Sequence, residues 1–131
     1  MKATIVQENG VSLSIEPIPG SENQIVAVRL VGTKLSSEIT EALEPAFEGM
    51  GSLSSFLKKA ALRQTALPAE RRSLCEDLAF TVSNEPHFEG FLLLRVYIGS
   101  NSDDESNWQV NASLLVTPEK LLSFASSVSG M

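Results

Sequence analysis

The chain has 131 residues, of which 43% are apolar and 20% charged, and these values are typical of one folded domain with a single core. Its one cysteine, Cys75, excludes an intrachain disulfide, and its longest strongly apolar run, Phe91–Leu94, is far too short to span a membrane. The net charge of −6 and a pI near 4.7 oppose nucleic-acid binding, which requires a dominant basic face.

The N-terminal residues predict a β-hairpin. Short apolar alternations at 3–7 and 11–15 flank Asn9-Gly10, and an Asn-Gly pair in this position favours a tight turn because both residues tolerate positive φ. Pro17 is expected to end the second strand, because proline cannot donate to a ladder.

Two further segments precede the first helix. Residues 24–31 are rich in β-branched residues and predict a strand. Residues 35–43 are compatible with a helix or a strand, since Leu35, Ile39 and Leu43 share a face in both. Pro45 would end a helix almost at once, so we favour a strand.

The middle of the chain predicts an amphipathic helix. Its apolar residues follow the i, i+3, i+4, i+7, i+8 spacing of one helix face: Leu53, Phe56, Leu57, Ala60 and Ala61. Lys58 and Lys59 lie near its C-terminal end, where the helix dipole favours cations.

Three strands are predicted next, at about 73–82, 88–99 and 108–117, joined by polar loops into an antiparallel meander. Thr117-Pro118-Glu119 then indicates a helix start, with a capping hydroxyl, a proline in the first turn and an acid beside it. The order of elements predicts a single α+β domain over residues 1–131: one antiparallel sheet of about six strands with two helices packed on it.

Cysteine usage and the N-terminal residues predict a cytoplasmic protein. A small secreted domain would normally carry several cysteines. The first apolar stretch, Ala3–Val6, is about half as long as the apolar region of a signal peptide. Neither a membrane nor a nucleic-acid partner is therefore expected.

The negative charge is concentrated in the C-terminal half. Residues 1–72 contain eight acids and eight bases, whereas residues 73–131 contain eight acids against Arg95 and Lys120. One interpretation is a basic protein partner for the acidic half, because charge complementarity speeds association. The other interpretation is ordinary solvated surface.

The loop at 100–108 is the predicted contact site for a protein partner. It contains three adjacent acids, Asp103, Asp104 and Glu105, and is followed by the only tryptophan, Trp108. Tryptophan is enriched at binding hot spots. The alternatives are a solvated loop tip and a tryptophan that packs in or beside the core.

No catalytic, cofactor-binding or metal-binding residues are predicted. His87 is the only histidine, which excludes histidine clusters, and Cys75 lies toward the opposite end of the same predicted strand. Glycine-rich phosphate loops have no counterpart, and the acids at 103–105 lack the alternating spacing of a calcium loop.

From the central helix onward the chain carries a series of patterned residues: Leu53-x-x-Phe56-Leu57, Ser73-Leu74-x-x-Asp77-Leu78, a polar turn around His87 and Gly90, alternating Leu92, Leu94 and Val96, then Trp108, Leu114, Val116 and Leu121-x-x-Phe124-Ala125. Over residues 50–129 this layout resembles the WapI-type immunity proteins of bacteria, which are associated with neutralising toxins delivered between competing cells. Leu67-Pro68-Ala69-Glu70 stands where that family has a tryptophan- and glycine-rich stretch. The resemblance implies a cytosolic binding protein without catalytic residues.

Three functions are compatible with the sequence. The first is a non-catalytic protein-binding domain, in its most specific form an immunity-like inhibitor of a bacterial toxin. The second is a homo-oligomeric structural or regulatory domain that pairs with a copy of itself through a sheet edge or an exposed face. The third is a small enzyme whose site is assembled from scattered polar residues.

Overall fold

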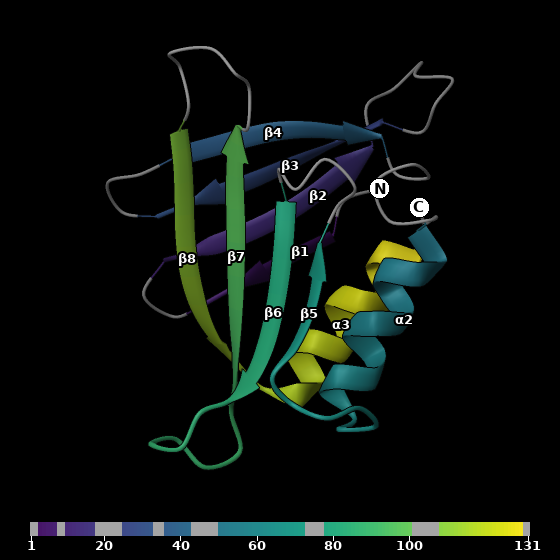
Figure 1. Ribbon diagram of the computed structural model, residues 1–131, viewed down its shortest axis with the longest axis vertical. Helices are drawn as coiled ribbons and strands as arrows, with labels where there is room; N and C mark the ends of the chain where they lie inside the picture. The colour runs from purple at the N-terminus through teal and green to yellow at the C-terminus, as the bar shows by residue number, and fades with distance from the viewer. Residues whose placement is uncertain are drawn as a thin grey trace.

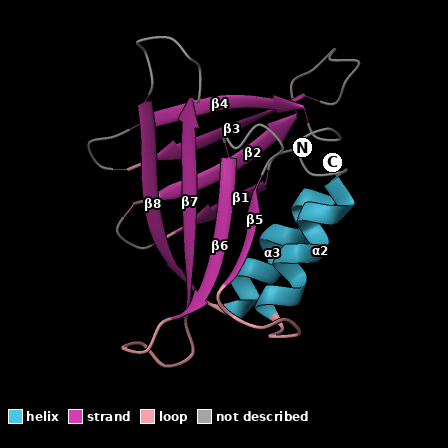
Figure 2. Cartoon of the chain, viewed as in Figure 1, coloured by secondary structure: helices cyan, strands magenta, loops and turns pink. Residues whose placement is uncertain are grey.

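The computed structural model describes residues 3–7, 10–17, 25–32, 36–42, 50–72, 78–100 and 108–129. These residues form an α+β fold of antiparallel strands and two helices, which confirms the predicted class (Figures 1 and 2). One sheet has the order β1 (Ala3–Val6), β2 (Ser12–Pro17), β3 (Ile25–Val31) and β4 (Ser36–Ala42). The other has the order β5 (Ala69–Arg72), β6 (Leu78–Asn84), β7 (Leu92–Ser100) and β8 (Trp108–Val116). The helices are α2 (Met50–Ala61) and α3 (Pro118–Ser129).

The first sheet begins with the predicted hairpin. β1 pairs antiparallel with β2, and the turn between them contains Gly10 with a φ of 91°, a conformation that favours glycine. β2 ends at Pro17, where the sequence predicts its end, and includes that proline as its last residue. The described pairing of β1 with β2 stops at Ile15, so Pro17 pairs with Val26 of β3 beyond that ladder and interrupts none of its hydrogen bonds.

The ambiguous segment is a strand, as we favoured. β4 pairs with β3 over its whole length, from Ser36 opposite Val31 to Ala42 opposite Ile25. The pairing with β3 extends over all seven residues of β4, whereas a helix over the same residues would have been limited to about two turns before Pro45.

The second sheet differs from the prediction in two places. β5 is a strand that the sequence does not predict. It has only four residues, of modest apolar character, and pairs with β6. β7 begins at Leu92 and not at Phe88, because 85–91 forms a turn in which Gly90 has a φ of 84°. The described strands form two sheets of four, where the sequence predicts one sheet of about six.

The two helices pack side by side along one flank of the strands (Figure 1). α2 buries its predicted apolar stripe, and α3 buries apolar residues of its own, against each other and the core. Ser54 Oγ of α2 donates a 2.8 Å hydrogen bond to the carbonyl of Ala125 in α3. α3 contacts β1 and α2 contacts β5, the edge strands of the two sheets. The helix pair therefore bridges these two edges and does not cover the outer face of β5–β8.

The core lies between the sheets and the helices. In Figure 1 the strands of the β1–β4 sheet cross behind those of the β5–β8 sheet. Both sheets direct alternate apolar residues inward, including Leu13, Leu30 and Leu94, each at most 1% exposed. Within the described part of the chain, neither helix has the length and apolar character needed to cross a membrane.

Candidate functional site

The outer face of the β5–β8 sheet carries the principal candidate site. Antiparallel register aligns residues across the four strands so that their side chains share one face. One row runs from β5 to β8 through Glu70, Thr81, Arg95 and Ser113. The next row runs through Arg72, Ala79, Tyr97 and Asn111. We call these two rows, together with Gln109, the Arg95 face.

The Arg95 face is hollowed. A depression of about 400 Å³ lies on it, lined by Glu70, Arg72, Ala79, Thr81, Arg95, Val96, Tyr97, Gln109 and Asn111. Ala79 points outward but is only 6% exposed, because it lies in register between the larger Arg72 and Tyr97. A small residue between two large ones gives this part of the sheet its concave shape.

The face is polar and carries more positive than negative charge. Arg72 Nε donates to Glu70 Oε1 in an ion pair between exposed side chains, and an exposed pair of this kind contributes little to stability. Arg95 is exposed on the next strand but one, so two guanidinium groups face one carboxylate. Guanidinium groups bind carboxylates in a planar, two-pronged geometry, and arginine and tyrosine are enriched at binding hot spots.

The acids of the C-terminal half lie away from this face wherever they are described. Glu85 and Glu89 belong to the turn between β6 and β7, and Glu119 is in the first turn of α3. The strands β6, β7 and β8 contain no acid, and their one charged residue is Arg95. The negative charge of this half is therefore carried by its turns and helix and not by its sheet face, over the residues described.

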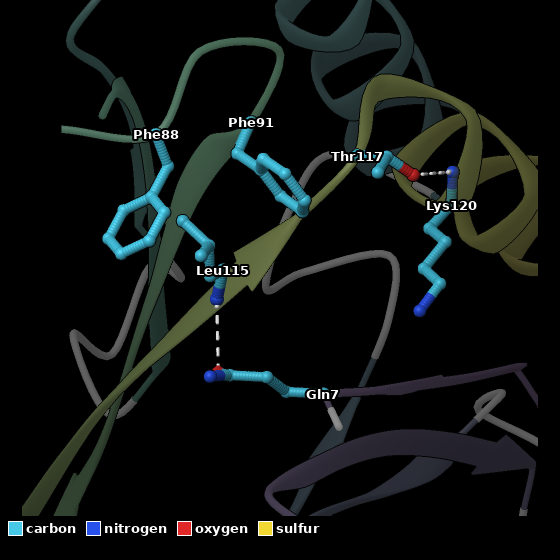
Figure 3. A pocket seen from close by; sticks show the side chains of 6 residues that line it. All are labelled: Gln7, Phe88, Phe91, Leu115, Thr117 and Lys120. Carbon is cyan, nitrogen blue, oxygen red and sulfur yellow. Dashed lines mark hydrogen bonds between the residues drawn. The ribbon is translucent and has the colours of Figure 1, made fainter. Parts of the chain in front are cut away.

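A second, smaller depression of about 250 Å³ lies at the opposite end of β8 from Trp108 (Figure 3). Its lining residues come from the β1–β2 hairpin, the β6–β7 turn, β8 and the start of α3: Gln7, Phe88, Phe91, Leu115, Thr117 and Lys120. Phe88 is 54% exposed and stands across the cleft from Lys120.

Two hydrogen bonds involve the residues that line this cleft. Gln7 Oε1 accepts from the backbone N–H of Leu115 at 3.0 Å, which ties the first sheet to the second. Thr117 Oγ1 accepts from the backbone N–H of Lys120 at 3.2 Å and so caps α3, as the sequence predicts. The cleft offers aromatic surface and one ammonium group, but its lining residues contain no neighbouring acid–base or nucleophile–base pair.

The residues predicted as a contact site are placed only in part. Asp103, Asp104 and Glu105 lie outside the described residues. Trp108 is the first residue of β8, where its backbone pairs with Ser100 at one end of the sheet. The prediction for the 100–108 loop is therefore neither supported nor contradicted by the arrangement of the described strands.

The two residues considered for nucleophilic chemistry are likewise not brought together by any described contact. Cys75 lies outside the described residues, and His87 is exposed in the β6–β7 turn, where its backbone N–H donates to Glu85 Oε1 at 3.0 Å. Among the residues that the structure describes, no group of three or more His, Cys, Asp or Glu side chains is positioned to hold a metal ion.

Sequence reasoning missed Arg95 and Tyr97. Both occupy the outward positions of β7, between the inward Leu94, Val96 and Ile98, and are therefore fixed by the same alternation that identifies the core. The signal was present: an arginine and a tyrosine two residues apart on one strand face, beside amide side chains of the next strand. It was hidden because polar residues on a strand also occur on any solvated face.

Comparison of the chain with protein-family models, curated proteins and solved structures found no match in any of the three.

Proposed function

We propose that this chain is a non-catalytic protein-binding domain whose contact surface is the Arg95 face. The observation that carries the proposal is a hollowed sheet face, left open by both helices, with Arg95 and Tyr97 at its centre and amide side chains beside them. The ladder holds the backbone of these strands in place, so little backbone ordering is needed when a partner binds.

The charge of the face favours an acidic segment of the partner. Arg72 and Arg95 stand against Glu70, so a carboxylate entering the hollow meets a net positive group of side chains. A basic partner at Asp103, Asp104 and Glu105 stays a separate prediction for the loop before β8. The two predictions concern different surfaces and can be tested by separate substitutions.

The most specific form of the proposal is an inhibitor of a bacterial toxin. The resemblance of residues 50–129 to WapI-type immunity proteins supports it, as does the open, preformed surface on the second sheet. An inhibitor of this kind needs a surface that excludes the toxin from its target and no chemistry of its own. Cytoplasmic localisation is part of the same proposal.

The test is a binding measurement by calorimetry against the products of neighbouring genes, above all any large secreted toxin. Arg95→Ala and Tyr97→Ala are each expected to weaken binding at least tenfold, because loss of a hot-spot side chain costs about 1.4 kcal/mol or more. Lys59→Ala removes an exposed cation on α2 that does not line the hollow, and it is the matched control that leaves affinity unchanged.

Two results would contradict the proposal. Full affinity of Arg95→Ala and Tyr97→Ala for a partner that the wild-type protein binds would move the contact surface elsewhere. Absence of binding to every product of the gene neighbourhood would remove the toxin-inhibitor form.

A further inference from the structure

β8 is an edge strand that, over the residues the structure describes, has little of the usual protection against pairing, since Gln7 contacts it only at Leu115. It is nine residues long, contains no proline and no charged residue, and pairs one-to-one with β7 without a bulge. Natural edge strands are normally short, charged, bulged or covered. The edges β1 and β5 are contacted by α3 and α2, and the edge β4 carries Glu38 and Glu41.

The direction of one hydrogen bond identifies the peptide groups at this edge. The N–H of Leu115 donates to Gln7 Oε1 and so points away from β7. N–H groups alternate in direction along a strand, so those of Gln109, Asn111 and Ser113 also point away from β7, together with their carbonyls. No hydrogen bond between described residues satisfies these six groups.

We infer that a second copy of this chain pairs with β8, antiparallel to it, about a two-fold axis at Asn111. Asn111 then stands opposite Asn111 of the second copy, and Gln109 stands opposite Ser113. In this register each of the three outward N–H groups meets an outward carbonyl of the other copy. The contact forms six backbone hydrogen bonds and joins the two β5–β8 sheets into one continuous sheet.

The side chains at this edge favour a second copy. Self-pairing of a strand places like residues near one another, which is unfavourable when they are charged. Every side chain of β8 is uncharged although each chain has a net charge of −6, so this edge is a place where two copies can meet without direct repulsion. On the inner side, Val110 would pair with Ala112, and both already pack against the core.

The assembly goes beyond the proposed function and does not depend on it. A two-fold axis perpendicular to the sheet places both Arg95 faces on the same side. The two Tyr97 residues would lie three strand spacings apart, about 14 Å. Such a dimer would present two binding faces side by side to one partner.

Sedimentation velocity of the full chain at high micromolar concentration tests the inference. The wild-type protein and Asn111→Ala are expected to be dimers, since both retain the backbone N–H. Asn111→Lys sets two ammonium groups opposite one another, and Asn111→Pro removes one outward N–H without touching the ladder to β7; both are expected to sediment as monomers. Thermal unfolding near that of the wild type shows that each variant is folded.

A cysteine pair tests the register without relying on loss of assembly. In a Cys75→Ser background, Asn111→Cys is expected to form an intermolecular disulfide under oxidation, because directly opposed Cα atoms lie about 5.5 Å apart. Gln109→Cys is the matched control and should not cross-link, because the two residues at position 109 would be offset by four residues, about 14 Å.

Two outcomes overturn the inference. One is a wild-type protein that stays monomeric throughout the concentration range. This outcome counts against the inference even if an unrelated extended peptide binds along β8. The other is a dimer that survives Asn111→Lys and fails to cross-link through Asn111→Cys, since that dimer would use a different surface.

Discussion

The two faces of the β5–β8 sheet are built from the same strands and differ in almost every property. Phe80, Leu94 and Leu114 on the inner face are completely buried, whereas their immediate neighbours on the outer face are half-buried or exposed, with the exception of Ala79. Burial restricts these inner positions to apolar residues that fill the core. The outer face is free of that restriction, so its arginine, tyrosine and amide side chains are the better indicators of function.

The largest expected effect comes from breaking the inner face. Phe80→Ala should destabilise the protein by about 3–5 kcal/mol, because it removes a fully buried ring and leaves a cavity. Thr81→Ala, one residue further and on the other face, should change stability by no more than about 0.5 kcal/mol. Urea unfolding of both variants measures the difference.

The contrast between these neighbours is the point of the measurement. If Thr81→Ala were as destabilising as Phe80→Ala, the outer face would contribute to folding as much as the core does. Its polar residues would then be explained by packing, and the Arg95 face would lose its claim as a binding surface.

The inner face was also the part that the sequence could predict. The alternation of Leu78, Phe80 and Val82 and the helical spacing of Leu53, Leu57 and Ala60 follow directly from the need to bury apolar area. The local turn signal of Asn9-Gly10 likewise predicted the first hairpin correctly. These features are determined by residues close together in the chain.

The division into two sheets could not be predicted in the same way. β5 is four residues long, Ala-Glu-Arg-Arg, and its pairing with β6 rather than its own pattern makes it a strand. The Arg95 face shows the same limitation, because Arg72, Arg95 and Asn111 belong to three strands and become neighbours only through the register. Long-range pairing creates both features, and no local pattern encodes it.

The turn between β6 and β7 helps to set the register of these two strands. Gly90 lies there with a φ of 84°, in open space, so only the backbone conformation opposes a side chain at this position. Gly90→Ala should cost about 1–2 kcal/mol, and Gly90→Asn should cost less because asparagine tolerates positive φ better. Equal losses measured by thermal unfolding would show that the side chain and not the backbone is the cause.

The buried seam between the helices provides a smaller test of the same contrast. Ser54 is 2% exposed and donates to the carbonyl of Ala125, whereas Ser55 is exposed on the other side of α2. Ser54→Ala should cost about 1 kcal/mol through the lost hydrogen bond. Ser55→Ala should be neutral or stabilise by a few tenths, because alanine has the higher helix propensity. A neutral Ser54→Ala in chemical unfolding would mean that the bond between the helices contributes nothing net.

The smallest expected effect on folding carries the most information about function. Arg95→Ala should change the free energy of unfolding by no more than about 0.5 kcal/mol, because the arginine is exposed. Tyr97→Ala should change it by no more than about 1 kcal/mol, because the tyrosine is half-buried. Residues that can be removed at so little cost to folding are not held in place by the core. If urea unfolding instead showed a loss comparable to that of Phe80→Ala, weakened partner binding by these variants would reflect a damaged fold. Near-native stability together with a tenfold loss of affinity would assign the arginine and the tyrosine to recognition.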